Sequence, residues 1–127
     1  IISEVVGSPE EHVNKTMDLL LDKIKEQKTT RINNEKKFDA QKMENSPLFS
    51  GFIEYEAEFN KIEDIIGFCF DFMPSSIEII DPPHVTLSTS ASTDFFNELL
   101  ARLHQNDMFL RNALIELRQL KESLLKK

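Results

Sequence analysis

The 127-residue sequence contains one cysteine, three glycines, five prolines and no tryptophan. The single cysteine, Cys69, excludes a disulfide within the chain and a zinc site built from several cysteines. It also favours a reducing, cytoplasmic compartment. So few glycines and prolines exclude collagen-like and low-complexity sequence. Ten phenylalanines and a hydrophobic content of 40% supply instead the apolar material for a folded domain with a core.

Long hydrophobic runs and excess positive charge are also missing. No apolar run approaches the roughly 20 residues that cross a bilayer, so we expect no contact with the membrane interior. The formal net charge is −7, which argues against nucleic-acid binding because that binding depends on neutralising phosphates. The charge is uneven: residues 44–98 carry eleven acidic side chains and one basic one, whereas residues 99–127 carry three acidic and six basic ones. We therefore expect an acidic protein with a mildly basic end.

Two amphipathic helices are predicted by apolar residues that recur every three or four positions. The first spans 9–27 and starts with a capping box at Ser8–Glu11. The second spans 61–73 and ends before Pro74. We expect both helices on one face of a sheet, with Phe70 of the second helix in the core.

The clearest strand alternates apolar residues with glutamates, which is the pattern of a half-buried antiparallel strand. Its apolar positions are Ile53, Tyr55, Ala57 and Phe59. A weaker strand is predicted around 36–43, and a short buried strand at Ile77–Ile80, where two prolines end it. The sequence therefore predicts an α+β domain over 1–92, with a three-stranded, mainly antiparallel sheet and two packed helices.

The stretch from Phe52 to Pro83 reads strand, helix, strand and ends in Ile77-Glu78-Ile79-Ile80-Asp81-Pro82. This order resembles the ferredoxin-like regulatory domains. More narrowly, it is similar to the C-terminal extension of WYL-type transcriptional regulators, in which a comparable strand ends in an acid and a proline. The stretch Met73-Pro74-Ser75-Ser76 is also similar to small uncharacterised archaeal proteins. The chain lacks the Trp-Tyr-Leu core and a helix-turn-helix, so the resemblance implies a ferredoxin-like order and no site residue.

The strongest pattern lies in the last third of the chain, where residues 94–126 contain neither glycine nor proline. A helix of that span would be about 50 Å long, whereas a domain of about 90 residues is only about 25–30 Å across. Apolar residues recur there with a heptad period, the pattern of a coiled coil. We call the nine inner heptad positions the seam: Phe96, Leu99, Leu103, Asn106, Leu110, Ala113, Leu117, Leu120 and Leu124. The sequence predicts a C-terminal oligomerisation helix within 93–127.

The positions beside the seam indicate how the helices associate. Arg102 would face Asp107 of a neighbour, and Glu116 would face Lys121, as in a parallel pair. Four further apolar residues widen the stripe, which favours four helices or packing against the rest of the chain: Phe95, Leu100, Phe109 and Leu114. We expect a homodimer or homotetramer, and packing of the stripe within its own subunit is the alternative.

Residues that could carry chemistry are scattered. The three histidines, His12, His84 and His104, show no metal-ligand spacing, and no glycine-rich phosphate loop is present. We therefore assign no catalytic, metal or cofactor residue. The interpretation is a non-enzymatic, self-associating interaction or regulatory module, which could also bind another protein. A small-ligand sensor, with its pocket between sheet and helices or at the subunit interface, is the alternative, and an enzyme with an interface active site is the third hypothesis.

Overall fold

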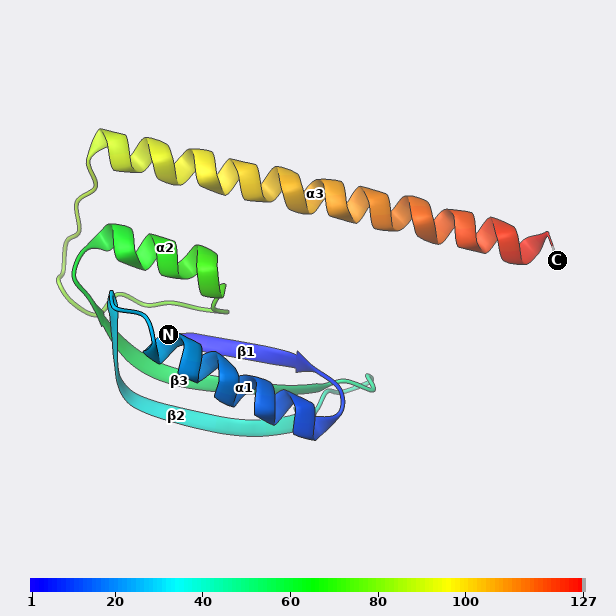
Figure 1. Cartoon of the computed structure of the whole chain (residues 1–127), viewed down its shortest axis with the longest axis horizontal. Coiled ribbons are helices and arrows are strands. Elements are labelled where there is room, and N and C mark those ends of the chain that lie inside the picture. Colours follow the sequence, from blue (N-terminus) through cyan, green and yellow to red (C-terminus); the bar gives the residue numbers. More distant parts are fainter. Residues whose placement is uncertain (127) are drawn as a thin grey trace. The chain divides into compact units, whose positions relative to one another are not determined.

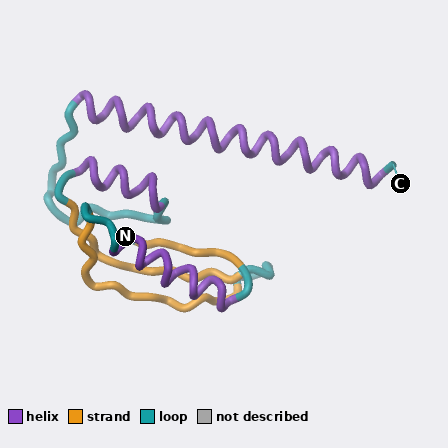
Figure 2. The backbone as a smooth tube through the Cα atoms, in the orientation of Figure 1, coloured by secondary structure: helices purple, strands orange, loops and turns teal. Residues whose placement is uncertain are grey.

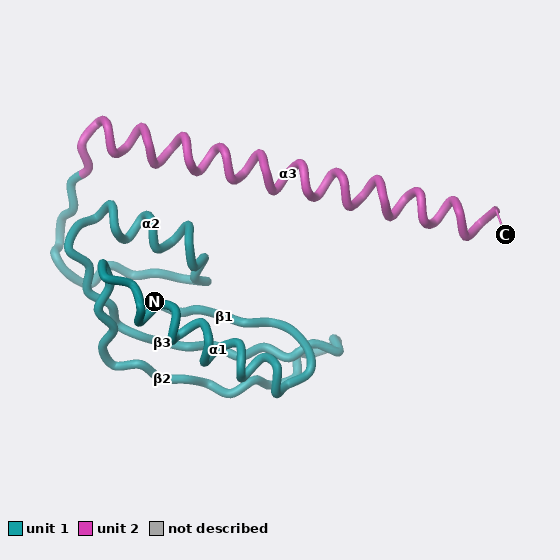
Figure 3. Tube along the Cα trace, viewed as in Figure 1, with its two compact units in different colours: residues 1–86 teal, residues 87–127 magenta. Residues whose placement is uncertain are grey.

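The structure is a computed structural model that describes residues 1–126. Its elements follow the order β1 (Ile2–Gly7), α1 (Glu10–Lys25), β2 (Thr30–Lys42), β3 (Phe49–Phe59), α2 (Ile62–Phe72) and α3 (Thr89–Leu125) (Figure 1). The chain divides into two compact units after residue 86 (Figure 3). We call residues 1–86 the body. The second unit consists of α3 with its flanking residues, and Lys127, within the expected helical segment, lies outside the described residues.

Three antiparallel strands form the sheet of the body, in the order β1-β3-β2 (Figure 2). This confirms the predicted α+β class with a three-stranded antiparallel sheet. The strand predicted around 36–43 is the second half of the longer β2. Strand β1 was not predicted, although three of its six residues, Ile2, Val5 and Val6, are β-branched and favour a strand.

The strand predicted at Ile77–Ile80 does not form, and this prediction was wrong. Ser76 makes a single antiparallel bridge to Ile2 of β1. Residues 77–80 follow this bridge and join no strand of the sheet in the described part of the chain. Ile79 and Ile80 are instead 45% and 75% exposed.

The core lies on one face of the sheet, which both body helices cover. Its buried residues come from α1, β2, β3 and α2: Val13, Met17, Ile24, Ala40, Ile53, Tyr55 and Phe68. The thioether of Met17 fills the space above Gly51, where an added Cβ would lie 2.5 Å from the Met17 terminal methyl. The alternation predicted for β3 is thus confirmed, with Ile53 and Tyr55 inside and Glu54 outside.

The buried residue of α2 is Phe68, whereas Phe70, which we expected in the core, is only half-buried. The ring of Phe68 contacts Tyr55 and Phe59 of β3 edge-to-face, at centroid distances of 6.5 and 5.4 Å, and Phe72 at 5.0 Å. The apolar residues of α2 extend around most of the helix, so the sequence pattern does not single out the face that meets β3.

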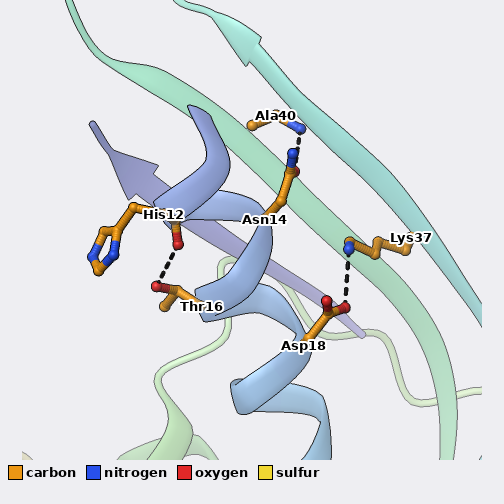
Figure 4. Close-up of polar contacts among 6 residues, drawn as sticks. All are labelled: His12, Asn14, Thr16, Asp18, Lys37 and Ala40. Carbon is orange, nitrogen blue, oxygen red and sulfur yellow. Dashed lines mark hydrogen bonds and ion pairs between the residues drawn. The ribbon is translucent and has the colours of Figure 1, made fainter. Parts of the chain in front are cut away.

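Polar contacts join α1 to β2 (Figure 4). The pairing of β2 with β3 is irregular between Phe38 and Gln41. At this irregularity the backbone N–H of Ala40 donates to Oδ1 of Asn14 at 2.8 Å. The Lys37 ammonium binds the Asp18 carboxylate nearby at 2.9 Å. A side chain of α1 therefore replaces a hydrogen bond that the sheet does not supply.

We expect Asn14→Leu to lower the free energy of unfolding by about 1–3 kcal/mol, because it leaves the Ala40 N–H without an acceptor. Asn14→Asp is the matched control, since it keeps an oxygen acceptor at the same position. Urea denaturation of both variants measures the difference. Equal stabilities for Asn14→Leu and the wild type would show that this hydrogen bond does not support the bulged strand.

Candidate functional site

Helix α3 carries all nine seam residues. It begins four residues before the predicted segment 93–127, because Ser88 caps it by accepting a hydrogen bond from the Ala91 N–H at 3.0 Å. Its 37 residues correspond to a length of about 55 Å at 1.5 Å per residue. One uninterrupted helix with a heptad pattern places the seam along a single side of α3.

The described part of the chain buries no residue of α3. The leucines at 103, 110, 117, 120 and 124 are between 55% and 71% exposed, and Phe96 is 57% exposed. Asn106 and Ala113 are exposed as well, and Leu99 is half-buried. The seam is therefore a long apolar stripe that the unit of α3 does not itself cover.

Apolar side chains also flank the seam, as the sequence predicted. Leu100, Phe109 and Leu114 are each more than half exposed, whereas Phe95 is half-buried and contacts Phe96 at 5.3 Å. Two further apolar residues of α3, Met108 and Ile115, were not predicted to take part and are 64% and 53% exposed. These two residues lie seven positions apart on the side away from the seam, so their heptad spacing is a sequence signal that indicates a second apolar row. The middle of α3 is consequently apolar on most of its circumference.

The charged residues beside the seam form ion pairs within α3. Arg102 lies 3.5 Å from Glu98, and Arg111 lies 3.0 Å from Asp107. We had expected Arg102 and Asp107 to face each other across two chains. Exposed ion pairs contribute only about 0–1 kcal/mol, so these contacts are weak enough to exchange for pairs between helices.

The body contains a cavity of about 650 Å³. It lies between the end of β3, the start of α2 and residues 77–85. Polar and apolar atoms contribute about equally to its lining, and Lys61, Glu78 and Asp81 are among its charged residues. The volume falls in the range of about 300–1,000 Å³ that is typical of ligand sites.

The charged residues that line this cavity are Glu56, Glu58, Lys61, Glu78 and Asp81. Its lining includes no histidine or cysteine, and residues 1–126 hold no group of three or more metal-ligating side chains. His12 is on α1, His84 on the segment between α2 and α3, and His104 on α3. The three histidines therefore lie on three different segments of the chain.

Tyr55 is a buried titratable residue, 1% exposed, and its hydroxyl shares a hydrogen bond of 2.9 Å with the buried Ser3 hydroxyl. Burial raises the pKa of Tyr55; the Ser3 hydrogen bond opposes this effect and the Cys69 thiol adds to it. The ordinary tyrosine pKa is about 10. The folded state therefore keeps the proton on Tyr55 at pH values at which the unfolded chain loses it.

We expect the free energy of unfolding to fall as the pH rises above about 10, the ordinary tyrosine pKa. Tyr55 contributes its full stabilisation below that pH. The contribution is lost as the pH rises towards the raised pKa that Tyr55 has in the folded state. Urea titrations between pH 8 and pH 11 should show a steeper loss for the wild type than for Tyr55→Phe. Parallel curves for the two proteins would contradict this coupling.

Cys69 is half-buried on α2, and burial raises the pKa of its thiol. A raised pKa lowers the fraction of reactive thiolate at neutral pH. We expect a thiol reagent to label the native protein at pH 7.5 several-fold more slowly than the urea-unfolded protein. Equal labelling rates would contradict the placement of Cys69.

In the part of the chain that the structure describes, no helix has the length and apolar character to pass through a lipid bilayer.

Comparison with known proteins gives one match. No curated protein and no solved structure matches the chain. The sequence model of the MJ0538 family matches residues 1–121, a range that contains the whole body and α3 up to its last turn. The chain therefore belongs to the MJ0538 family.

Proposed function

We propose that this protein is a self-associating interaction module whose copies join through α3. The observation that carries the proposal is the solvent-exposed seam, with neighbouring apolar residues on both sides. Exposed apolar surface on this scale marks protein interaction sites on soluble proteins. The heptad period is the one that allows helices to supercoil and bury a common stripe.

The free energy gained by burying the seam side chains is large enough to drive association. For a pair of helices, the twelve seam leucines would contribute roughly 18–36 kcal/mol on full burial. The loss of translational and rotational freedom costs about 4–15 kcal/mol. The balance favours assembly even when a large part of the leucine surface stays partly exposed.

The width of the apolar surface bears on the number of helices. A two-stranded coil would cover the seam and leave Leu100, Phe109 and Leu114 partly in water. A bundle of four helices buries such flanking positions as well. The wide stripe therefore supports a tetramer over a dimer, and Asn106 within the seam would fix the register between helices.

Disulfide cross-linking tests the parallel, in-register arrangement. In a Cys69→Ala background, Leu120→Cys places a thiol near one end of the seam. In a parallel assembly this cysteine meets its own counterpart, so mild oxidation should yield covalent dimers. Gln119→Cys, one position along and away from the seam, is the matched control. Efficient cross-linking of the control but not of Leu120→Cys would rule out the proposed interface.

A small-ligand sensor is the second candidate function, and the cavity of the body supports it. The body runs strand, helix, strand, strand, helix, after which Ser76 bridges to β1. These are five of the six elements of a ferredoxin-like order, and we propose that arrangement for the body. A metabolite that raised the melting temperature of the wild type, but not of a variant with a filled cavity such as Ile65→Trp, would favour this function.

A further inference from the structure

In the body, all of which the structure describes, one face of the sheet is covered by no body helix. Helices α1 and α2 both pack on the opposite face, where Ser3, Ile53 and Tyr55 are buried. Successive side chains of a strand point to opposite faces, so the exposed Glu4 and Glu54 lie on the uncovered face. We call this uncovered face of β1, β2 and β3 the outer face.

Two phenylalanine rings form the apolar centre of the outer face. Phe38 of β2 and Phe52 of β3 are direct partners in the strand register, and their rings stack with a centroid distance of 4.5 Å. Phe52 is 38% exposed although β3 is the central strand, and Val6 of β1, which is diagonal to it, is 45% exposed. Aromatic side chains are enriched in the centres of protein interfaces. The outer face therefore has the composition of an interface that a further layer would bury.

Two carboxylates border the phenylalanine pair on the side of β1. Glu4 lies directly opposite Phe52, and Glu54 lies two residues further along β3, opposite Ile2. Glu4 accepts a hydrogen bond from the Ser50 hydroxyl at 3.1 Å, whereas the Glu54 side chain has no hydrogen bond or ion pair within residues 1–126. Diagonal neighbours on one face of a sheet are about 7–8 Å apart. A single cation placed between these two carboxylates can therefore contact both.

The basic residues of the outer face are engaged elsewhere. Lys36 is opposite Glu54 in the register, but its ammonium lies over the Phe38 ring, 5.0 Å from the ring centroid. Arg31 is near the start of β2, where it lies 4.0 Å from Glu58. The position of Lys36 shows that the phenylalanine pair accommodates a cation. The carboxylates on the β1 side are left for a cation from outside.

We propose that the outer face binds an α-helix of a partner protein, and that this helix presents an arginine beside apolar residues. The apolar side chains of the partner helix cover Phe52 and Val6, and its guanidinium contacts Glu4 and Glu54. Arginine fits better than lysine, because a planar guanidinium pairs with carboxylates and also stacks on an aromatic ring. The bound body has three layers, with the sheet between its own helices and the partner helix.

The contact is made by side chains and not by strand addition. The backbone of β3 is already paired with β1 on one side and with β2 on the other. The outer face therefore offers a surface of side chains rather than free backbone groups. A helix suits such a surface, since its own backbone hydrogen bonds are satisfied internally.

A second copy of this chain fits the outer face less well. Two outer faces packed together would bring the carboxylates of Glu4 and Glu54 against those of the other copy. Helix α3 has three arginines, but two of them, Arg102 and Arg111, already form ion pairs within α3. A partner helix with an unpaired arginine has the more favourable charge.

Peptide titration followed by amide NMR tests the proposal. The probes are capped helical peptides of about 18 residues, which share one row of leucines and carry arginine, lysine or glutamine beside it. We expect the arginine peptide to shift the amide signals of Glu4, Phe52 and Glu54. The glutamine peptide should bind about tenfold more weakly, because it lacks the charge and the cation–π contact. The lysine peptide should bind with an affinity between the two.

Three variants test the residues of the outer face with the arginine peptide. Glu54→Gln removes an exposed carboxylate without a partner, so it should keep the wild-type melting temperature and weaken binding about threefold. Glu44→Gln, the same charge change in the exposed β2–β3 connection, is the matched control and should bind as the wild type does. Phe52→Thr keeps a β-branched residue in the strand and should weaken binding about tenfold, because it removes the ring.

A leucine-rich helix is also a ligand for the seam, so the titration is repeated in the full-length Leu110→Glu/Leu117→Glu variant. Binding to the outer face does not depend on α3 and should be unchanged there, whatever the oligomeric state. Three results would overturn the proposal: shifts confined to α3, equal binding of the arginine and glutamine peptides, or equal binding of the arginine and lysine peptides. A peptide of residues 101–119 that bound as tightly as the arginine peptide would also overturn it, because the occupant would then be a second copy of α3.

Discussion

Replacing Leu110 and Leu117 together with glutamate will convert the assembly into monomers. Both side chains lie on the seam, and both are exposed in the single chain. In the assembly each would bring a carboxylate into an apolar interface, which costs several kcal/mol per buried charge. Helix α3 buries no residue in the described chain, so the body should keep its cooperative melting transition. Size-exclusion chromatography with light scattering measures the mass.

The matched control for this variant is Asn112→Glu with Gln119→Glu. It adds the same two charges to α3, at exposed polar positions away from the seam. We expect this control to assemble as the wild type does. If both double variants dissociated equally, charge repulsion rather than the seam would govern the assembly.

Phe68→Ala will lower the free energy of unfolding by about 3–5 kcal/mol, the usual loss for a buried phenylalanine. Phe68 is 4% exposed and its ring contacts Tyr55, Phe59 and Phe72. A domain of this size has a total stability of about 5–15 kcal/mol, so the variant should be close to unfolding. Urea denaturation in the Leu110→Glu/Leu117→Glu background measures the body without the contribution of assembly.

Phe70→Ala is the comparison for Phe68→Ala, because Phe70 lies two residues away on the same helix and is only half-buried. We expect it to cost less than half as much. A larger loss for Phe70→Ala than for Phe68→Ala would show that the opposite face of α2 meets the sheet.

The parts of the fold that depend on local sequence pattern were predictable. Strand β3 alternates apolar and acidic residues, and α3 repeats its apolar residues every seven positions, so each pattern specifies an element by itself. Even there the start of α3 differs from the predicted residue 93, because the Ser88 hydroxyl caps the helix. The hydroxyl of Ser88 is one of several candidate caps in a run of small polar residues, and the sequence does not rank them.

The parts that depend on pairing between distant residues were not predictable. The segment Ile77–Ile80 has the composition of a strand, yet in the described chain only the neighbouring Ser76 bridges to β1, at Ile2. Strand β1 takes its place in the sheet, although only its β-branched residues indicated a strand. The cavity lies where the end of β3 and the start of α2 meet residues 77–85, which come later in the chain. No local sequence pattern predicts that these distant segments meet.

Sedimentation equilibrium of the wild-type chain tests self-association most directly. At micromolar concentration we predict a mass of two or four times the 14.7 kDa of one chain, with four favoured by the wide apolar surface of α3. A mass of 14.7 kDa at every concentration would contradict the proposed function.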